Sequence, residues 1–373
     1  MMTKSSTKSS NNSPGNLTTP RHKNSTNQER HSSIKKKIVL VVKVTLVVGL
    51  LYFLIQKGFI SLQATQQALK QWQKILTAFL TLFFTSFLGI IRWQWLLRAH
   101  NIHLKWTRTI QLNYIGTFFN LALPGAVSGD FVKAFYIGKE VKGQRSRAFG
   151  SILFDRVAGL SALVFVSAGA LLVGFDSFSH SLLLHAIQYL ILFAAIVVFC
   201  FFTYLFLVRE HHDPLLRLFR YFDKRISKFQ SITRIYEGLR HYHNHRLTVI
   251  KVLALSIVIH LLLGYCCYNL ALAVQPTPLS LLPVYVIVPL GLLVTAVPIA
   301  PAGVGTGNVA FLYFFSLIGF ARGADVYSLY ALLNILIGCM GGIIYFRFRS
   351  HEPTLPMEET TSPQTLISAE SEI

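Results

Sequence analysis

Long apolar runs with almost no charge constrain this sequence more than any other feature. The run at 182–208, LLLHAIQYLILFAAIVVFCFFTYLFLV, contains no Asp, Glu, Lys or Arg, and neither does ILTAFLTLFFTSFLGII at 75–91. Neither run alternates between apolar and polar residues as a half-buried strand would. A helix needs about 20 apolar residues to cross the hydrocarbon core of a bilayer. The chain is therefore expected to be an all-α polytopic membrane protein.

The composition supports this fold class and argues against a nucleic-acid partner. Of the 373 residues, 53% are hydrophobic and only 13% are charged. The net charge of +20 comes from basic residues at the ends of the apolar runs, which is the positive-inside pattern of membrane proteins. All cysteines lie in apolar segments without metal-ligand spacing, so we expect neither a metal nor a cofactor; they are Cys200, Cys266, Cys267 and Cys339.

Two polar tails flank the membrane domain, which we place at 38–347. Residues 1–37 are predicted to form a disordered basic cytoplasmic tail, and residues 348–373 a disordered acidic tail. The run at 38–55 follows three lysines and resembles the start of a signal peptide, but no small-residue cleavage site follows it. It is interpreted as an uncleaved first span that leads out of the cytoplasm.

A helix breaker interrupts the third apolar segment. LPGAVSGD at 123–130 follows the run that begins at 110, and five basic residues lie between 133 and 147. A complete crossing would place these charges outside. A re-entrant hairpin that turns at LPGAVSG keeps them in the cytoplasm, provided that protein or water satisfies the irregular backbone.

A second interrupted segment gives the chain an inverted symmetry. The last span, 326–346, ends at basic residues and so ends inside, which makes 279–320 a hairpin that enters from outside. Spans 75–91 and 149–174 flank the first hairpin as 249–273 and 326–346 flank the second. We expect about six spanning helices plus two opposed re-entrant hairpins; the alternative is eight ordinary spans. Broken segments in corresponding positions of inverted halves point to a transporter's substrate site.

The polar connection 209–247 is predicted to lie on the cytoplasmic face. Within 214–229, apolar residues recur at helical spacing and basic residues occupy the other face, so this part should be an interfacial amphipathic helix on anionic lipid headgroups. A partner-binding helix is the alternative. HYHNH at 241–245 is interpreted as solvated surface rather than a metal site.

Both hairpin turns end in residues that favour helix N-termini. Ser128-Gly129-Asp130 and Thr306-Gly307-Asn308 each precede an apolar arm. The N-terminus of a helix carries about half a positive charge and unpaired N–H groups, which suits a phosphate. The alternative is that these residues only cap their helices.

Charges inside a predicted span add to the candidate site. Asp155 and Arg156 lie within 149–174, and intramembrane charges usually face the bundle interior and often mark a substrate path. A structural ion pair is the alternative. Trp93, Trp95 and Trp106 are interpreted as interfacial anchors. The candidate substrate-binding residues are Asn120, Pro124, Gly125, Ser128, Gly129, Asp130, Lys133, Asp155, Arg156, Pro301, Gly303, Gly305, Thr306 and Asn308.

Several short blocks in order resemble a known family. Arg92 with Leu96-Leu97, then FFNLALPGAVSGDFVKAF, FDRVAGL at 154–160 and VPIAPAGVGTGN at 297–308 resemble the transmembrane region of lysylphosphatidylglycerol synthases, also called flippase-like membrane proteins. The resemblance covers about 38–347. It implies an inverted-repeat bundle that, in the synthases, moves a lipid between leaflets.

The chain departs from the family pattern at both turns. The family usually has Gly-Gly-Asp followed by Arg, where this chain has Ser128 and then Lys133. Its second hairpin usually ends in Glu, where Asn308 stands here, which puts coupling to protonation of that carboxylate in doubt. The soluble aminoacyl-transfer domain of the synthases has no counterpart among the short polar segments, so no synthase activity is expected.

These observations predict a transporter or flippase of an anionic or glycosylated lipid. The expected ligand is a membrane phospholipid or a lipid-linked glycan, in a bacterial cytoplasmic (inner) membrane with both termini in the cytoplasm. The alternative is a non-transporting accessory subunit of an envelope lipid or glycan pathway, with an envelope-enzyme partner or a homo-oligomer. An enzyme is not expected, because the sequence has no nucleophile–base or metal constellation at suitable spacing.

Overall fold

The computed structural model describes residues 62–122, 128–141, 144–174, 182–208, 213–223, 229–295, 303 and 305–349. The regular structure in these ranges is helical, without strands. The two predicted tails lie outside them, apart from the last two residues of the final helix, and so does the predicted first span at 38–55. The predicted all-α class is confirmed for the described part.

Five described helices are long and apolar enough to cross a membrane, so the chain is an integral membrane protein. Four of them extend past the predicted spans, because their end turns carry polar residues that suit the membrane interface. The five helices are α3 (Trp72–Ala99), α6 (Arg145–Val173), α7 (Leu182–Leu207), α10 (Arg246–Val274) and α13 (Gly323–Arg349). A short helix, α2 (Leu62–Lys70), precedes α3.

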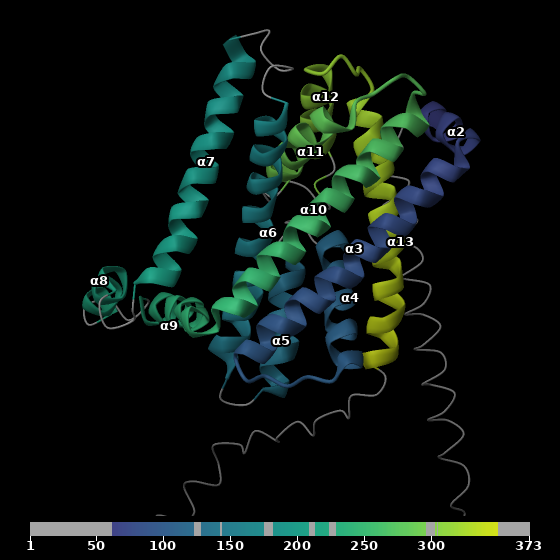
Figure 1. The fold of residues 1–373 in the computed structure, drawn as a ribbon. Coiled ribbons are helices and arrows are strands. Elements are labelled where there is room, and N and C mark those ends of the chain that lie inside the picture. Colours follow the sequence, from purple (N-terminus) through teal and green to yellow (C-terminus); the bar gives the residue numbers. More distant parts are fainter. Residues whose placement is uncertain are drawn as a thin grey trace, which may run out of the picture. The chain divides into compact units, whose positions relative to one another are not determined.

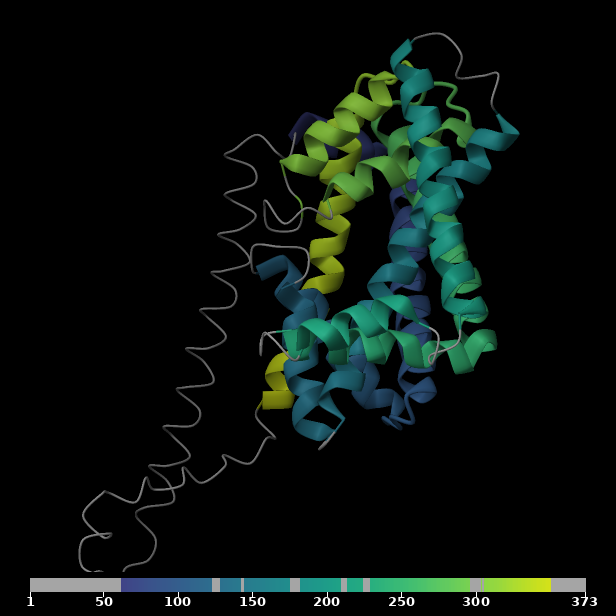
Figure 2. The ribbon, with the colours of Figure 1, turned by 90° about the vertical axis from the view of Figure 1, so that its left-hand side faces the viewer.

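Two pairs of shorter helices occupy the positions of the predicted hairpins. They are α4 (Trp106–Ala122) with α5 (Ser128–Glu140), and α11 (Leu281–Thr295) with α12 (Thr306–Ser316). With 13 and 11 residues, α5 and α12 are about 20 and 17 Å long, shorter than the hydrocarbon core of about 30 Å. Figures 1 and 2 place the two pairs at opposite ends of the bundle. This geometry agrees with opposed hairpins, whose insertion from opposite sides stays a prediction.

The first pair is antiparallel and in close backbone contact. Arg108 at the start of α4 forms an ion pair with Glu140 at the end of α5. A Cβ atom on Gly129 would overlap the carbonyl oxygen of Gly116, so only glycine allows the helices to approach this closely. At the other end of the pair, the backbone N–H of Gly129 donates to Asn120 Oδ1 over 2.7 Å. An α4 side chain therefore satisfies this N–H at the first turn of α5.

The second pair is held by its own turn and by α13. Gly305 precedes α12 with a φ of +89°, a conformation that favours glycine. Its N–H donates to Asn308 Oδ1 over 3.1 Å. Asn308 Nδ2 in turn donates to the carbonyl oxygen of Ala324 over 3.0 Å and to Ser328 Oγ over 2.7 Å. Asn308 thus both closes the turn and joins α12 to α13.

Both pairs use α13 as a common support. Gly307 of α12 packs against the ring of Tyr327, and Gly338 of α13 packs against Leu121 at the end of α4. Tyr327 and Gly338 are about 16 Å apart along the helix axis. The ends of the two pairs that carry the interrupted turns therefore approach each other along the middle of α13.

The described part of the polar connection contains two short helices, where the sequence predicts one helix over 214–229; residues 224–228 lie outside the described part. The two helices are α8 (Pro214–Asp223) and α9 (Phe229–Arg240). Asp213 accepts hydrogen bonds from the N–H groups of Leu215 and Leu216, at 2.9 and 3.1 Å, and lies 2.8 Å from Arg240 Nε. Burial opposes ionisation of Asp213, but hydrogen bonds from Tyr204, from the N–H of Leu216 and from Tyr236, together with the charge of Arg240, lower its pKa. Helix α9 packs against α6, where Gly238 meets Gly150.

The histidine-rich segment forms a 3-10 helix, η3 (His241–His245), that packs against the end of α3. Tyr242 is fully buried and donates to the carbonyl oxygen of Leu96 over 3.1 Å. The ring of His241 stacks on His100, with 4.9 Å between centroids. Burial, aided by the charges of His241 and Arg147, lowers the pKa of His100 to about 3. The interpretation of 241–245 as solvated surface is therefore wrong for Tyr242, which the tight turn directs inward, whereas Asn244 is exposed.

Cysteine labelling tests the membrane topology. In a variant without native cysteines, we expect Ser146→Cys to react with a membrane-impermeant reagent only from the cytoplasmic side. Ala321→Cys should react only from the outside. Both positions are exposed, so a lack of reactivity would not reflect burial. External labelling at 146 would contradict the first hairpin and the inverted repeat with it.

Glycine replacement tests the contact between α4 and α5. Gly129→Ala should destabilise the protein by about 1–3 kcal/mol, because the helices must separate to admit a methyl group. Gly169→Ala in α6 is the control: no atom lies within 4 Å of its Cβ position, so the change should be neutral or stabilising. Thermal unfolding in detergent measures both, and equal stabilities would show that the close contact is not formed.

Candidate functional site

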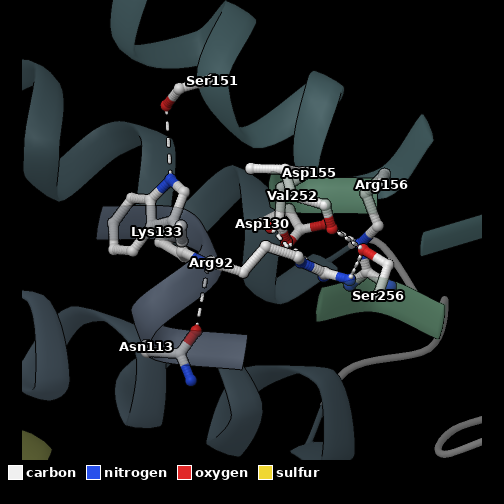
Figure 3. Close-up of polar contacts among 10 residues, drawn as sticks. Arg92, Asn113, Asp130, Lys133, Ser151, Asp155, Arg156, Val252 and Ser256 are labelled. Carbon is white, nitrogen blue, oxygen red and sulfur yellow. Dashed lines mark hydrogen bonds and ion pairs between the residues drawn. The ribbon is translucent and has the colours of Figure 1, made fainter. Parts of the chain in front are cut away.

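A bidentate ion pair links Arg92 of α3 to Asp155, one of the two predicted intramembrane charges of α6. Arg92 Nε and Nη2 donate to Asp155 Oδ1 and Oδ2 over 2.7 and 2.9 Å. Arg92 Nη1 also donates to Ser256 Oγ of α10 over 2.9 Å (Figure 3). The side chains of Arg92 and Asp155 are only 12% and 15% exposed. One guanidinium therefore joins three long helices, and removing either charge would leave the other buried without its partner.

A second ion pair connects α5 to α6. Asp130, the third residue of α5, pairs with Arg156 (Figure 3). The carboxylate of Asp130 thus pairs with a side chain of the next long helix, so Asp130 does not only cap the arm that follows the turn. Asp130 is buried, whereas the Arg156 side chain is 42% exposed. In this ion pair, the guanidinium side chain is therefore the accessible partner.

Lys133 lies one turn farther along α5 and is buried, with 5% exposure. Its Nζ donates to Asn113 Oδ1 over 3.2 Å and lies 3.9 Å from the centroid of the Trp93 ring. Trp93 is itself fully buried, and its indole N–H donates to Ser151 Oγ over 3.3 Å. The interpretation of Trp93 as an interfacial anchor is wrong, because the ring is buried and its face contacts the buried ammonium of Lys133.

We refer to Arg92, Asp130, Lys133, Asp155 and Arg156 as the charged cluster. The charges in it come from three helices, and the acidic members each pair with an arginine. Among the described residues, no group of three or more His, Cys, Asp or Glu side chains is placed to hold a metal ion. The cluster can hold an anion through its cationic groups and its hydrogen-bond donors.

The structure divides the predicted site into two parts. Asp130, Lys133, Asp155 and Arg156 come together in the charged cluster, and Asn120, Ser128 and Gly129 shape the adjoining end of α4 and α5. In the second pair, Thr306 Oγ donates to the carbonyl oxygen of Gly303 over 3.0 Å, and Asn308 bonds to α13. Gly305 precedes them. Pro124, Gly125 and Pro301 lie outside the described residues.

The sequence interpretation missed residues that α3 and α4 contribute. Arg92 follows the apolar run 75–91 and reads as an interfacial charge, yet α3 continues to Ala99 and carries it inside the bundle. The apolar residues Leu96 and Leu97 beyond Arg92 were the sequence feature that could have indicated a longer buried helix. Asn113 was visible as a polar residue in an apolar run, but only the structure places it against Lys133.

Comparison with known proteins agrees with the resemblance noted in the sequence. The sequence model of the lysylphosphatidylglycerol synthase transmembrane region matches residues 40–333. A relative, the UPF0104 membrane protein PH1989 of Pyrococcus horikoshii, is 28% identical over 205 residues, which cover 52% of this chain and 58% of that protein. The chain thus spans less than two thirds of the relative's length. No solved structure matches the chain.

A double-mutant cycle tests the Arg92–Asp155 pair. Arg92→Gln and Asp155→Asn should each destabilise the protein by about 3–5 kcal/mol, because each leaves a buried charge unpaired. The double variant should lose less than the sum of the two, with a coupling above about 1 kcal/mol. Arg322, the residue before α13, and Asp325, in its first turn, are paired at 2.8 Å and more exposed; they provide the control cycle, with coupling below about 0.5 kcal/mol. Additive losses at 92 and 155 would contradict the pair.

Proposed function

Because the chain belongs to the family of lysylphosphatidylglycerol synthase transmembrane regions, we propose that it moves an anionic or glycosylated lipid between the leaflets of its membrane. Membership of this family is compatible with a lipid-related membrane function. The charged cluster is the proposed headgroup site. The proposal is transport without chemistry, so the chain acts as a transporter and not as an enzyme.

The depth of Arg156 is the observation that carries this proposal. It lies 11 residues into α6, which begins at Arg145. Counted from 149, where the predicted span begins, it lies seven residues, or about 10 Å, into a hydrocarbon core of about 30 Å. A guanidinium at that depth is costly, yet its side chain is 42% exposed. A phosphate-bearing headgroup that contacts Arg156 would offset this cost, since arginine binds phosphate through two parallel hydrogen bonds.

The arrangement of the two helix pairs supports a path across the membrane. The first turn of α5 carries Asp130, and the positive end of this helix adds to the field of the cluster. The first turn of α12 packs against Tyr327, about 16 Å along α13 from Gly338, which packs against the end of α4. In the proposed cycle, the headgroup moves from the charged cluster towards the turn before α12 while its acyl chains stay in the hydrocarbon.

The proposed membrane and orientation of the chain follow from the sequence analysis. The membrane is the cytoplasmic (inner) membrane, and both chain termini lie in the cytoplasm. The exposed Leu215 and Leu218 of α8 enter the lipid interface, and the basic side chains of 214–229 contact anionic headgroups. Of that range, residues 224–228 lie outside the described part. A non-transporting accessory subunit remains the outcome if lipid exchange fails.

Asp130→Asn tests the proposal. The purified protein is reconstituted into liposomes with fluorescently labelled phosphatidylglycerol, and leaflet exchange is followed by chemical quenching of the outer leaflet. We expect exchange to slow by about tenfold or more, because Arg156 loses the carboxylate that positions it.

Asp325→Asn is the matched control. It removes a carboxylate in the first turn of α13 that pairs with Arg322, three residues earlier and outside the charged cluster, and should leave exchange unchanged. Normal exchange by a well-folded Asp130→Asn protein would reduce that carboxylate to a structural role. Absence of exchange in the unmodified protein, with every lipid tested, would favour the accessory subunit.

A further inference from the structure

The charged cluster has more positive than negative charge. It contains Arg92, Lys133 and Arg156 against Asp130 and Asp155, so its formal net charge is +1. Each carboxylate has an arginine as its direct ion-pair partner. Among the described residues, the direct contacts of Lys133 Nζ are an amide oxygen and an aromatic ring, and neither carries a formal charge.

The two direct contacts of Lys133 Nζ suit an ammonium group, whereas its burial opposes the charge. An amide oxygen accepts from Nζ at 3.2 Å, and the face of Trp93 at 3.9 Å attracts a cation. Burial at 5% exposure makes a charge without a contacting carboxylate expensive. Stability alone does not account for a lysine here, because an apolar residue of similar volume would avoid that cost. The excess charge indicates a ligand.

The exposed side of the cluster is flanked by apolar side chains. Arg156 is 42% exposed, and the neighbouring Phe131 of α5 and Leu160 of α6 are 62% and 41% exposed. Phe131 also contacts the ring of Phe149. A lipid that approaches between α5 and α6 would meet apolar surface with its acyl chains and a guanidinium with its headgroup.

We propose that the charged cluster selects lipids whose headgroup carries a single negative charge in a phosphodiester, and that Lys133 is the residue that sets this selectivity. This inference rests on the proposed function, in which the cluster is the headgroup site. One phosphodiester neutralises the excess charge of the cluster. A zwitterionic headgroup adds a cation where cations are already in excess, and a phosphomonoester adds a second negative charge without a counterpart.

Lipid competition on the full chain tests the selectivity. The protein is reconstituted in vesicles of phosphatidylcholine, and association of spin-labelled lipids is measured by electron paramagnetic resonance. The probes are phosphatidylglycerol with one negative charge, zwitterionic phosphatidylethanolamine, and phosphatidic acid, a phosphomonoester. We expect phosphatidylglycerol to bind about tenfold more tightly than the other two, as one charge-assisted hydrogen bond provides.

Variants of two lysines on α5 locate the effect. Lys133→Gln should remove the preference for phosphatidylglycerol. Lys139→Gln is the matched control and should retain it, because Lys139 lies in the last turn of α5, 4.6 Å from the ring of Phe135 and outside the cluster. A preference that survives in Lys133→Gln would overturn the inference. If that variant does not fold, equal binding of the three lipids by the unmodified protein would overturn it.

The outcome separates this inference from the proposed function. Exchange of all three lipids at similar rates, with equal binding, would retain transport and overturn the selectivity. A preference for phosphatidylglycerol that depends on Lys133 without any leaflet exchange would overturn transport and support the selectivity. Displacement of phosphatidylglycerol by inorganic phosphate at equal concentration would also overturn the inference, because a lipid gains part of its binding from its acyl chains.

Discussion

The bidentate contact of Arg92 with Asp155 is the interaction on which the arrangement of the long helices depends. It joins α3 to α6, and the bond from Arg92 to Ser256 adds α10. Two charges buried at 12% and 15% exposure are tolerated only while they remain paired, because each alone would face an apolar interior. The helices that carry them are therefore held in one register, and α6 presents its next residue, Arg156, towards α5.

The short helices are positioned by close backbone contacts that a Cβ atom would prevent. Gly116 and Gly129 bring α4 against α5, and Gly338 admits Leu121 of α4 against α13. In a membrane, where the hydrophobic effect between helices is weak, such contacts and interhelical hydrogen bonds carry the packing. The same closeness directs the side chains of Asp130 and Lys133 towards α6 and Trp93, so the backbone contact and the charged cluster depend on each other.

Much of this could be anticipated from periodicity and charge alone. The helical class, five of the predicted spans and the interruption of two segments follow from apolar length and from proline and glycine. Asp155 and Arg156 stood out because charges inside an apolar run are rare. The extension of α3 beyond 91 was not anticipated, since Arg92 and the tryptophans around it look the same whether they face headgroups or a buried carboxylate.

The sequence by itself determined that the chain crosses a membrane, where its backbone is interrupted and which charges lie at depth, because these properties depend on local composition and on the cost of charge in hydrocarbon. Only the tertiary structure decided which charges meet. Arg92 and Asp155 are 63 positions apart, and Lys133 contacts Asn113 and Trp93 rather than a carboxylate. Pairing depends on how helices far apart in the chain rotate and pack, and so the excess positive charge beside Lys133 becomes visible only when the helices are assembled.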